Sequence, residues 1–433
     1  MVSAGLAELA TAVAGVTPGV TLRMAFGGVV EGYSDYDVAV GGQSTEPFPD
    51  QPSGADMLYS SGTTGRPKGV RPPLPDRQID QPGDAFVELL GPLYGFDRDT
   101  VYLSPAPIYH AAPLRFCGVV HALGGTVVLM RRFDAENALG ALVQYGPTHS
   151  QWVPTMFVRM LKLPSQVRSR YDVSTMRVAV HAAAPCPVEV KRAMIEWWGP
   201  VLYEYYSSTE GVGLTAITPR EWSQRPGSVG RAELGVLHVC GDDGQELPAN
   251  EVGTVYFGRP DSAFSYHADP EKTRLAQHPD HATWMTTGDI GYVDDDGYLY
   301  LTGRKDFTII SGGVNIYPQE VEDVLVLHPE VLDIAVVGVP DAEMGESVLA
   351  VVAPASTAEP GADLADTLIA HARAHLARHK VPRRVVFTND LPRTPTGKIL
   401  KAEIRRRYAT VPAGSAGKPP QPVPPLSDSR IDR

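Results

Sequence analysis

Cysteine is scarce in this sequence, and the few cysteines do not form a recognisable framework. Cys117, Cys186 and Cys240 are the three in 433 residues, and they lie far apart without a CxxC pair. This spacing argues against a set of disulfides and against a zinc site. Free thiols are typical of a reducing compartment, so we expect a cytoplasmic protein.

Long apolar runs and basic runs are also missing. No stretch approaches the length of a membrane span, and residues 1–15 lack a basic start and are interrupted by Glu8, which predicts a short amphipathic helix and not a signal peptide. A formal net charge of −12 gives no long-range attraction to nucleic acid or anionic lipid. We expect no nucleic-acid partner and no transmembrane segment. Peripheral membrane contact and a homodimer stay open.

What is present is the composition of a globular protein, with 43% hydrophobic and 20% charged residues. The length predicts two or three domains. Apolar runs alternate with helix-like segments such as 135–146, which predicts an α/β fold with a doubly wound, mostly parallel sheet. Residues 229–301 instead combine short β runs with Gly turns, as in antiparallel hairpins or a small barrel. A compact α+β unit begins near residue 305, and the Pro-rich tail from residue 411 is expected to be disordered.

The stretch YSSGTTGRPKG, residues 59–69, is the strongest candidate for a binding loop. It follows the predicted strand 55–58, and we expect it at the carboxyl end of a strand in the parallel sheet. It matches neither the Walker loop nor the dinucleotide fingerprint. Its glycines allow backbone N–H groups to face an anion, and its hydroxyls and lysine favour phosphate. These residues are Ser60, Ser61, Gly62, Thr63, Thr64, Gly65 and Lys68. The alternative, a solvated Ser/Gly loop, explains less well the preceding strand and the Pro-Lys-Gly ending.

Three other segments carry weaker signals, and an exposed loop or a surface side chain would explain any one of them alone. Glu210 follows Thr209 in YEYYSSTEG, and a carboxylate beside a hydroxyl suits Mg²⁺ on a nucleotide. Asp289 and Arg304 lie in Thr-Gly-Asp and Gly-Arg-Lys-Asp turns. Lys398 lies in PRTPTGKILK near the end of the chain.

Two tempting metal patterns are interpreted as structural. The DDDG stretch at 294–297 lacks the alternate spacing of a calcium loop and predicts a hairpin turn. His371, His375 and His379 are spaced for one helical face, but no Glu follows the first, so a solvated face is favoured. No G-x-S-x-G hydrolase motif occurs.

Eight segments, taken in order, resemble the adenylate-forming enzymes, which include acyl-CoA synthetases, adenylation domains of nonribosomal peptide synthetases and luciferases. They are YSSGTTGRPKG, PIYH, AAAPCP, YYSSTEG, TGDIG, GRKD, SGGVNIYPQEVE and PRTPTGKILK. PIYH and YYSSTEG are most similar to those of fatty-acyl and related acyl-CoA ligases. The resemblance implies that a carboxylate attacks the α-phosphate of ATP-Mg²⁺ to give acyl-AMP and pyrophosphate, after which the thiol of coenzyme A displaces AMP.

The resemblance also implies roles for individual residues. Residues 60–64 and Lys68 would hold the β- and γ-phosphates, and Gly65 would belong to the same ATP-binding loop. The adenine would lie against Ala183, Ala184, Pro185 and Tyr206. Thr209 would contact the α-phosphate and Glu210 the Mg²⁺. Asp289 would accept hydrogen bonds from the ribose, helped by Arg304. The acyl pocket would include His110, His181, Tyr205 and Gly211.

The resemblance implies a mobile C-terminal domain as well. Lys398 would bridge the carboxylate and the α-phosphate in the first half-reaction. Rotation about Asp306 would then remove Lys398 and bring Gly312 and Gly313 to the thiol tunnel. The expected domains are an AMP-binding domain at 1–305, the smaller mobile domain at 306–410 and the tail at 411–433.

The chain departs from the family pattern in four places. Relatives usually carry several βα units before the phosphate loop, and we expect this chain to lack them. Ser207 stands where Gly is common, Val314 stands where Glu is common, and VRPPLPDRQ replaces a Thr-His or Ser-His turn; we expect these to tune the pocket.

The leading hypothesis is an ATP-dependent acyl-CoA ligase for a fatty or other hydrophobic acid. The alternatives are an acyl-AMP ligase that loads a carrier protein and a non-catalytic fragment.

Overall fold

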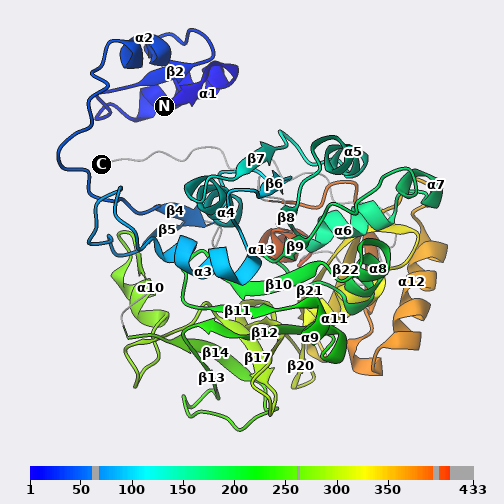
Figure 1. Ribbon diagram of the computed structural model, residues 1–433. Helices are drawn as coiled ribbons and strands as arrows, with labels where there is room; N and C mark the ends of the chain where they lie inside the picture. Colours follow the sequence, from blue (N-terminus) through cyan, green and yellow to red (C-terminus); the bar gives the residue numbers. More distant parts are fainter. Residues whose placement is uncertain (61–67, 261–263, 394–398, 410–433) are drawn as a thin grey trace. The chain divides into compact units, whose positions relative to one another are not determined.

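The computed structural model describes residues 1–60, 68–260, 264–393 and 399–409 (Figure 1). The chain separates into two compact units. The first comprises Met1–Ser53 and Asp76–Gln81, and the second comprises Gly54–Pro75 and Pro82–Arg433. The domain boundary expected near residue 305 falls inside the second unit and stays a prediction.

The first unit is a small α/β structure with three parallel strands in the order β1-β2-β3. Ala10 on α1 packs with Ala25 and Val30 to form its core. The helix predicted within residues 1–15 is confirmed as α1. The elements are β1 (Val2–Ser3), η1 (Ala4–Leu6), α1 (Ala7–Val16), β2 (Met24–Phe26), β3 (Ser34–Asp35) and α2 (Tyr36–Gly41).

The second unit is built on a large mixed sheet, of which one half is parallel. Its order is β10-β9-β8-β6-β7, and every neighbouring pair runs parallel, as predicted. These strands are β6 (Val101–Ser104), β7 (Thr126–Leu129), β8 (His149–Trp152), β9 (Val178–His181) and β10 (Leu202–Ser207). The helices among them are α3 (Ala85–Tyr94), α4 (Ala111–Ala122), α5 (Ala135–Tyr145), α6 (Pro154–Leu161), α7 (Ser165–Arg168) and α8 (Val188–Trp198).

The parallel half is covered by helices on both faces (Figure 1). Side chains alternate across a strand, so neighbouring residues enter different cores. Tyr102 on β6 packs with Phe116 of α4, whereas Leu103 packs with the residues of α5, α6 and α8. Both are fully buried. This two-sided burial is the doubly wound arrangement that the alternating sequence predicted.

The antiparallel half continues the same sheet beyond β10. Its strands follow the order β13-β14-β17-β18-β12-β11, with β16 paired to β14, so the region predicted as antiparallel hairpins extends the main sheet. The DDDG stretch connects β17 to β18, as expected of a hairpin turn. The elements are β11 (Leu214–Ile217), α9 (Pro219–Gln224), β12 (Ser228–Leu234), β13 (Val236–Cys240), β14 (Gly253–Gly258), β16 (Trp284–Met285), β17 (Asp289–Val293) and β18 (Leu299–Arg304).

The candidate phosphate loop connects two strands of a separate small sheet, and this corrects the sequence prediction. Residues 55–57 form no strand, and β4 (Leu58–Ser60) pairs antiparallel with β5 (Lys68–Arg71). On its other side β5 pairs with β15 (Ser265–Tyr266), which precedes α10 (Pro270–Leu275). The loop therefore does not follow a strand of the parallel sheet. A Cβ on Gly69 would lie 2.7 Å from the Met57 side chain and 3.1 Å from His267, so glycine permits this close pairing.

The C-terminal part of the second unit has its own sheet, in the order β20-β19-β22-β21 with β23 beside β22. Helices α11 and α12 pack with β21 and β22 around one core. The elements are η2 (Lys305–Phe307), β19 (Ile309–Ser311), β20 (Val314–Ile316), α11 (Pro318–Leu325), β21 (Val331–Asp341), β22 (Gly345–Pro354), α12 (Ala362–His375), η3 (Arg378–Lys380), β23 (Arg384–Phe387) and α13 (Lys401–Tyr408).

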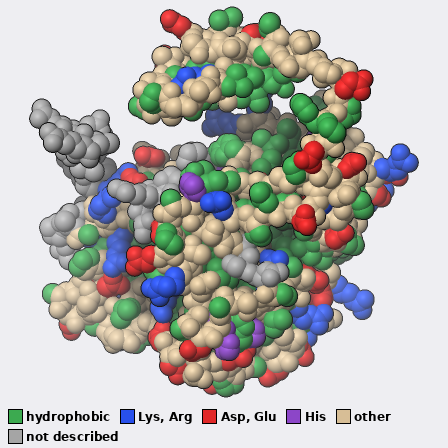
Figure 2. Space-filling view, turned by 90° about the vertical axis from the view of Figure 1, so that its left-hand side faces the viewer, with side chains coloured by type: hydrophobic (Ala, Val, Ile, Leu, Met, Phe, Trp, Pro, Cys, Tyr) green, Lys and Arg blue, Asp and Glu red, His purple; other side chains and the backbone are tan. Residues whose placement is uncertain are grey.

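No described helix is long and apolar enough to cross a membrane. On the face drawn in Figure 2, the coloured Lys and Arg side chains are dispersed among Asp and Glu and do not gather into one basic patch.

A buried ion pair ties α8 to β10. Lys191 Nζ lies 2.7 Å from Glu204 Oε2, and both side chains are almost completely buried. Lys191 also lies 4.8 Å from the centre of the Trp222 ring. Burial raises the pKa of Glu204, while Lys191 opposes that rise. Each side chain therefore compensates the charge of the other, because an unpaired charge would be costly in this core.

We expect Glu204→Gln to lower the free energy of unfolding by about 3–5 kcal/mol, because Lys191 would keep a buried charge without a partner. Urea denaturation measures this loss. Glu189→Gln is the matched control on α8, since Glu189 pairs with Arg192 at the surface and should change stability by less than about 1 kcal/mol. Equal effects of the two substitutions would contradict the role of the buried pair.

Candidate active site

Strand β10 and the turn after it carry three of the predicted site residues. Tyr206 lies near the end of β10, and Thr209 and Glu210 lie half-buried in the turn that follows. The Gly211 N–H donates to the Ser208 carbonyl at 3.0 Å and closes the turn. Gly211 has a φ of 65°, which glycine adopts without strain. The sequence thus places a hydroxyl and a carboxylate at the carboxyl end of a sheet strand, where ligands of such folds bind.

Asp289 is the centre of a first cluster. Its Oδ2 accepts hydrogen bonds from Tyr206 Oη at 2.7 Å and from Thr287 Oγ1 at 2.6 Å, and its Oδ1 accepts one from Arg304 Nε at 2.8 Å. Asp289 and Arg304 are opposite each other on β17 and β18. The structure therefore brings together Tyr206, Asp289 and Arg304, three residues that the sequence placed in separate motifs.

The pKa values of Tyr206 and Arg304 are both shifted within this cluster. Burial lowers the pKa of Arg304, but Asp289 and Tyr206 outweigh burial and raise it overall. Burial, and next the Asp289 carboxylate, raise the pKa of Tyr206 well above its usual value. At neutral pH Tyr206 is therefore a neutral phenol and Arg304 a guanidinium.

Lys68 and Glu210 meet at the side chain of Tyr266 in a second cluster. Tyr266 Oη donates to Glu210 Oε1 at 2.8 Å. Lys68 Nζ lies 5.3 Å from the centre of the Tyr266 ring, within the range of a cation–π contact. Lys68 comes from β5, Tyr266 from β15 and Glu210 from the turn after β10. The small sheet therefore brings its lysine to the carboxyl end of β10 in the large sheet.

The surroundings of Lys68 disfavour its positive charge. Burial lowers its pKa to about 8, helped by the nearby Lys272, while Glu210 and Asp306 act in the opposite direction. An anion placed here would relieve the repulsion between the two ammonium groups. The surroundings of Lys68 thus favour a negatively charged ligand.

The loop predicted to contact adenine follows β9. Ala183, Ala184 and Pro185 are all exposed, as a binding loop requires. Ala183 has a φ of 74°, in the left-handed region that disfavours a side chain. Strain of this kind is often found at ligand-binding positions.

The residues predicted for the acyl pocket are spread over different environments. His110 precedes α4, its ring lies 4.6 Å from the Tyr109 ring, and burial lowers its pKa. Tyr205 is buried beside Phe116 and its hydroxyl accepts a hydrogen bond from Gln151 at 3.1 Å. Gly211 lies in the turn described above. The described contacts do not join these three into one pocket, so their role stays a prediction.

His181 lies in the core. It has no exposed surface, and its Nε2 is 3.5 Å from Glu204 Oε2. Burial, and then Lys191, lower its pKa well below the usual value, so the ring is neutral at pH 7. His181 therefore lies in the core beside the Lys191–Glu204 ion pair. Its predicted role in the acyl pocket gains no support from this position.

The residues predicted for the hinge and the glycine segment lie in a short helix and a hairpin turn, and their roles stay predictions. Asp306 is exposed in the short helix η2. Gly312 and Gly313 both have positive φ, 58° and 79°, and connect β19 to β20. A two-residue hairpin of this type needs left-handed backbone at both positions, which explains the paired glycines.

Several predicted residues lie outside the described part of the chain. They are Ser61, Gly62, Thr63, Thr64, Gly65 and Lys398. Ser60 ends β4, and its backbone alone is described. Their roles stay predictions.

Metal clusters are absent from the described residues, where no group of three or more His, Cys, Asp or Glu side chains could hold an ion. Helix α12 ends at His375, so the prediction that His371, His375 and His379 share one helix is wrong. His379 lies in the separate turn η3. The rings of His371 and His375, both on α12, lie 4.4 Å apart, and the His371 ring also lies 5.2 Å from the ring of His328.

Two residues of the site were missed by the sequence analysis. Thr287 sits two positions before Asp289, and the Thr-Gly-Asp pattern was a usable signal for its hydrogen bond. Tyr266 gave no signal, because its partners Lys68 and Glu210 lie far from it along the chain.

Comparisons with known proteins find related sequences over most of this chain. The profile of the AMP-binding enzyme family matches residues 7–267, and that of the AMP-binding enzyme C-terminal domain matches residues 320–398. A feruloyl-CoA synthase of Amycolatopsis sp is 35% identical over 83% of this chain and 72% of its own length. The long-chain-fatty-acid–CoA ligase FadD13 of Mycobacterium tuberculosis is 33% identical over 82% of this chain and 68% of its own length.

Solved structures also resemble this chain over most of its length. ATP-bound MatB from Rhodopseudomonas palustris is similar with a TM-score of 0.77 and 28% identity, covering 95% of this chain and 79% of that one. The anthranilate CoA ligase AuaEII with anthranoyl-AMP has a TM-score of 0.79 and 25% identity, covering 94% and 77%.

The left-handed backbone of Ala183 leads to a stability prediction. Ala183→Gly should leave the free energy of unfolding unchanged or raise it by up to about 1 kcal/mol, because relief of strain offsets the added freedom of the unfolded chain. Ala184→Gly, one residue away and without a positive φ, should lower it by about 0.5–1 kcal/mol. Denaturation curves of the two variants decide this. An equal loss in both would show that Ala183 is not strained.

Proposed function

The chain belongs to the AMP-binding enzyme family, and we propose that it is an ATP-dependent acyl-CoA ligase acting on a fatty or other hydrophobic carboxylic acid. Its relatives are named CoA ligases and synthetases, so the reaction class is an AMP-forming acid–thiol ligation. The choice of a hydrophobic acid rests on the feruloyl and long-chain acyl substrates in those relatives' names.

One observation carries the proposal. Lys68 and Glu210, from distant parts of the chain, contact the same Tyr266 side chain. A cation and a carboxylate held together in a partly buried place fit the phosphates of a metal-bound nucleotide, which need both positive charge and a metal ligand.

Mg²⁺ fits the donor set at Glu210. Mg²⁺ in nucleotide sites is usually bound through one or two carboxylates and the phosphates themselves, and does not need a full protein cage. Glu210 supplies such a carboxylate, with Oε1 held by Tyr266 and Oε2 free of hydrogen bonds from the described residues. When bound, the ion would neutralise phosphate charge. Glu210 would hold it and Thr209 would contact the α-phosphate.

The first cluster is proposed to bind the nucleoside. Asp289 would accept hydrogen bonds from the ribose hydroxyls, while hydrogen bonds from Arg304 and Thr287 orient its carboxyl group. Tyr206 would pack against the adenine, with the loop at Ala183 on its other edge. Positioning of this kind lowers the barrier by removing the need to order the reactants in the transition state.

The reaction follows in two steps. An oxygen of the acid attacks the α-phosphorus, the bond to the bridging oxygen of the β-phosphate breaks, and pyrophosphate leaves. The sulfur of coenzyme A then attacks the acyl carbon, and the bond to AMP breaks. Lys68 and the loop 60–65 would stabilise the leaving pyrophosphate, and Lys398 would hold the carboxylate against the α-phosphate.

The C-terminal residues 306–410 are proposed to move between the two steps. Asp306 would serve as the hinge, and the hairpin at Gly312 and Gly313 would line the thiol path in the second step. Glycines that leave no side chain in the way suit such a path, and their presence favours coenzyme A over a carrier protein.

Pyrophosphate release from ATP tests the proposal. The chain is assayed with a long-chain fatty acid, ferulate, anthranilate or malonate, each with and without coenzyme A. We expect release with a hydrophobic acid and acyl-CoA formation once coenzyme A is added. Release without any transfer to coenzyme A would favour the carrier-protein alternative, and no release with any acid would favour a non-catalytic chain.

Lys398→Ala separates the two half-reactions. The variant should lose at least about 100-fold of acyl-AMP formation, because a positioned charge on the reacting groups is removed. It should still convert supplied acyl-AMP and coenzyme A to acyl-CoA near the wild-type rate. Liquid chromatography of both products measures this, and an equal loss in both half-reactions would contradict the movement proposed for residues 306–410.

A further inference from the structure

We propose that Tyr266 is a positioning residue that fixes the Glu210 carboxylate for the metal-bound phosphates and supports Lys68 beside it. The inference rests on the proposed function, since it gives Tyr266 a part in the same nucleotide site. None of the motifs that indicated the function includes Tyr266.

The hydrogen bond from Tyr266 determines how Glu210 is presented. Oε1 accepts from the phenol at 2.8 Å. This leaves Oε2 available to a ligand and removes most of the rotational freedom of the carboxylate.

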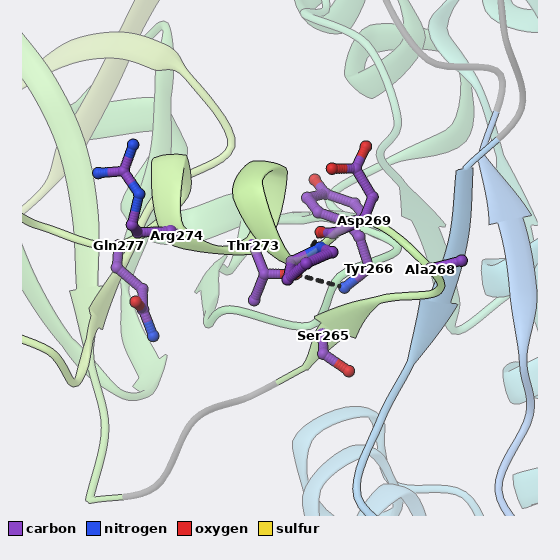
Figure 3. Close-up of a pocket in the computed structure, with 8 residues that line it drawn as sticks. Ser265, Tyr266, Ala268, Asp269, Thr273, Arg274 and Gln277 are labelled. Carbon is purple, nitrogen blue, oxygen red and sulfur yellow. Dashed lines mark hydrogen bonds between the residues drawn. The ribbon is translucent and has the colours of Figure 1, made fainter.

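Hydrogen bonds, strand pairing and ring packing fix the position of Tyr266. Its N–H donates to Thr273 Oγ1 at 2.9 Å, and Thr273 Oγ1 donates to the Asp269 carbonyl at 3.0 Å (Figure 3). Across the sheet it pairs with Val70 of β5. The side chain is almost fully buried and packs edge-on against Phe264 at 4.8 Å between ring centres. A tyrosine fixed in this way can hold its partner without moving.

The same ring lies beneath the Lys68 ammonium group, 5.3 Å from its centre. The negative face of an aromatic ring attracts a cation. One side chain therefore sets the distance between the cation and the carboxylate. Tyr266 also lines a pocket together with Asp269 and Thr273, while its hydroxyl contacts Glu210.

Tyr266→Phe is the direct test, because it keeps the ring under Lys68 and removes the hydrogen bond alone. Loss of a hydrogen bond to a charged group should weaken MgATP binding about 10- to 100-fold. It should raise the Mg²⁺ concentration for half-maximal rate by a similar factor. Binding of AMP without Mg²⁺ depends on the Asp289 cluster and should stay within about 2-fold of wild type. Calorimetry with MgATP and with AMP measures both.

Tyr298→Phe is the matched control. Tyr298 is equally buried and its hydroxyl donates to Glu221 at 3.0 Å, but Glu221 caps helix α9 and is not part of the proposed site. This variant removes the same kind of hydrogen bond. Its melting temperature can fall through loss of that bond, but its binding of MgATP and AMP should stay at wild-type values.

The outcomes separate cleanly. Weakened MgATP binding with unchanged AMP binding supports the inference. Unchanged MgATP binding, or an equal loss for AMP, overturns it and leaves the proposed function intact. A wild-type chain that binds neither nucleotide and releases no pyrophosphate with any acid contradicts the proposed function, and this inference with it.

Discussion

The buried pair of Lys191 and Glu204 is the interaction on which the site depends most. It fixes β10 from inside the sheet at 2.7 Å, where water cannot replace either partner. Two residues further along β10, Tyr206 reaches Asp289, and the turn after the strand presents Glu210. A strand free to shift would move both clusters at once. Burial, and then the neighbouring Lys191, lower the pKa of His181 beside the pair, so its ring is neutral.

The proposed nucleotide site is assembled from elements that are distant in the sequence and belong to two different sheets. Asp289 and Arg304 face each other across β17 and β18, and Glu210 follows β10. Lys68 comes from a small antiparallel sheet that β15 completes. Because Tyr266 of β15 contacts both Lys68 and Glu210, the small sheet and the large sheet meet at one side chain. The electrostatic strain on Lys68, whose pKa is lowered to about 8 first by burial and then by Lys272, is consistent with a place made for an anion.

Local patterns in the sequence predicted local structure well. Helix α5 lies at Ala135–Tyr145, as its apolar spacing indicated, because Asp134 caps its start and Gly146 ends it in the left-handed region. The parallel strands were predicted from the alternation of apolar and helix-like runs, and the hairpin at 294–297 from its Asp-Gly turn. Pairings between distant segments were not predictable in the same way. No local signal joins β5 to β15, and Tyr266 looks like any buried aromatic residue until its partners are known. Motif order predicted that Asp289 and Arg304 belong to one site, but their direct contact required the structure.

The central claim is that these clusters activate a carboxylic acid on ATP. Isotope exchange between labelled pyrophosphate and ATP tests it most directly, because exchange requires the reversible formation of acyl-AMP and needs no coenzyme A. Exchange should depend on a hydrophobic acid and be lost in Asp289→Asn, whose side chain can no longer pair as a charge with Arg304. Exchange absent with every acid, or present at the wild-type rate in Asp289→Asn, would contradict the account.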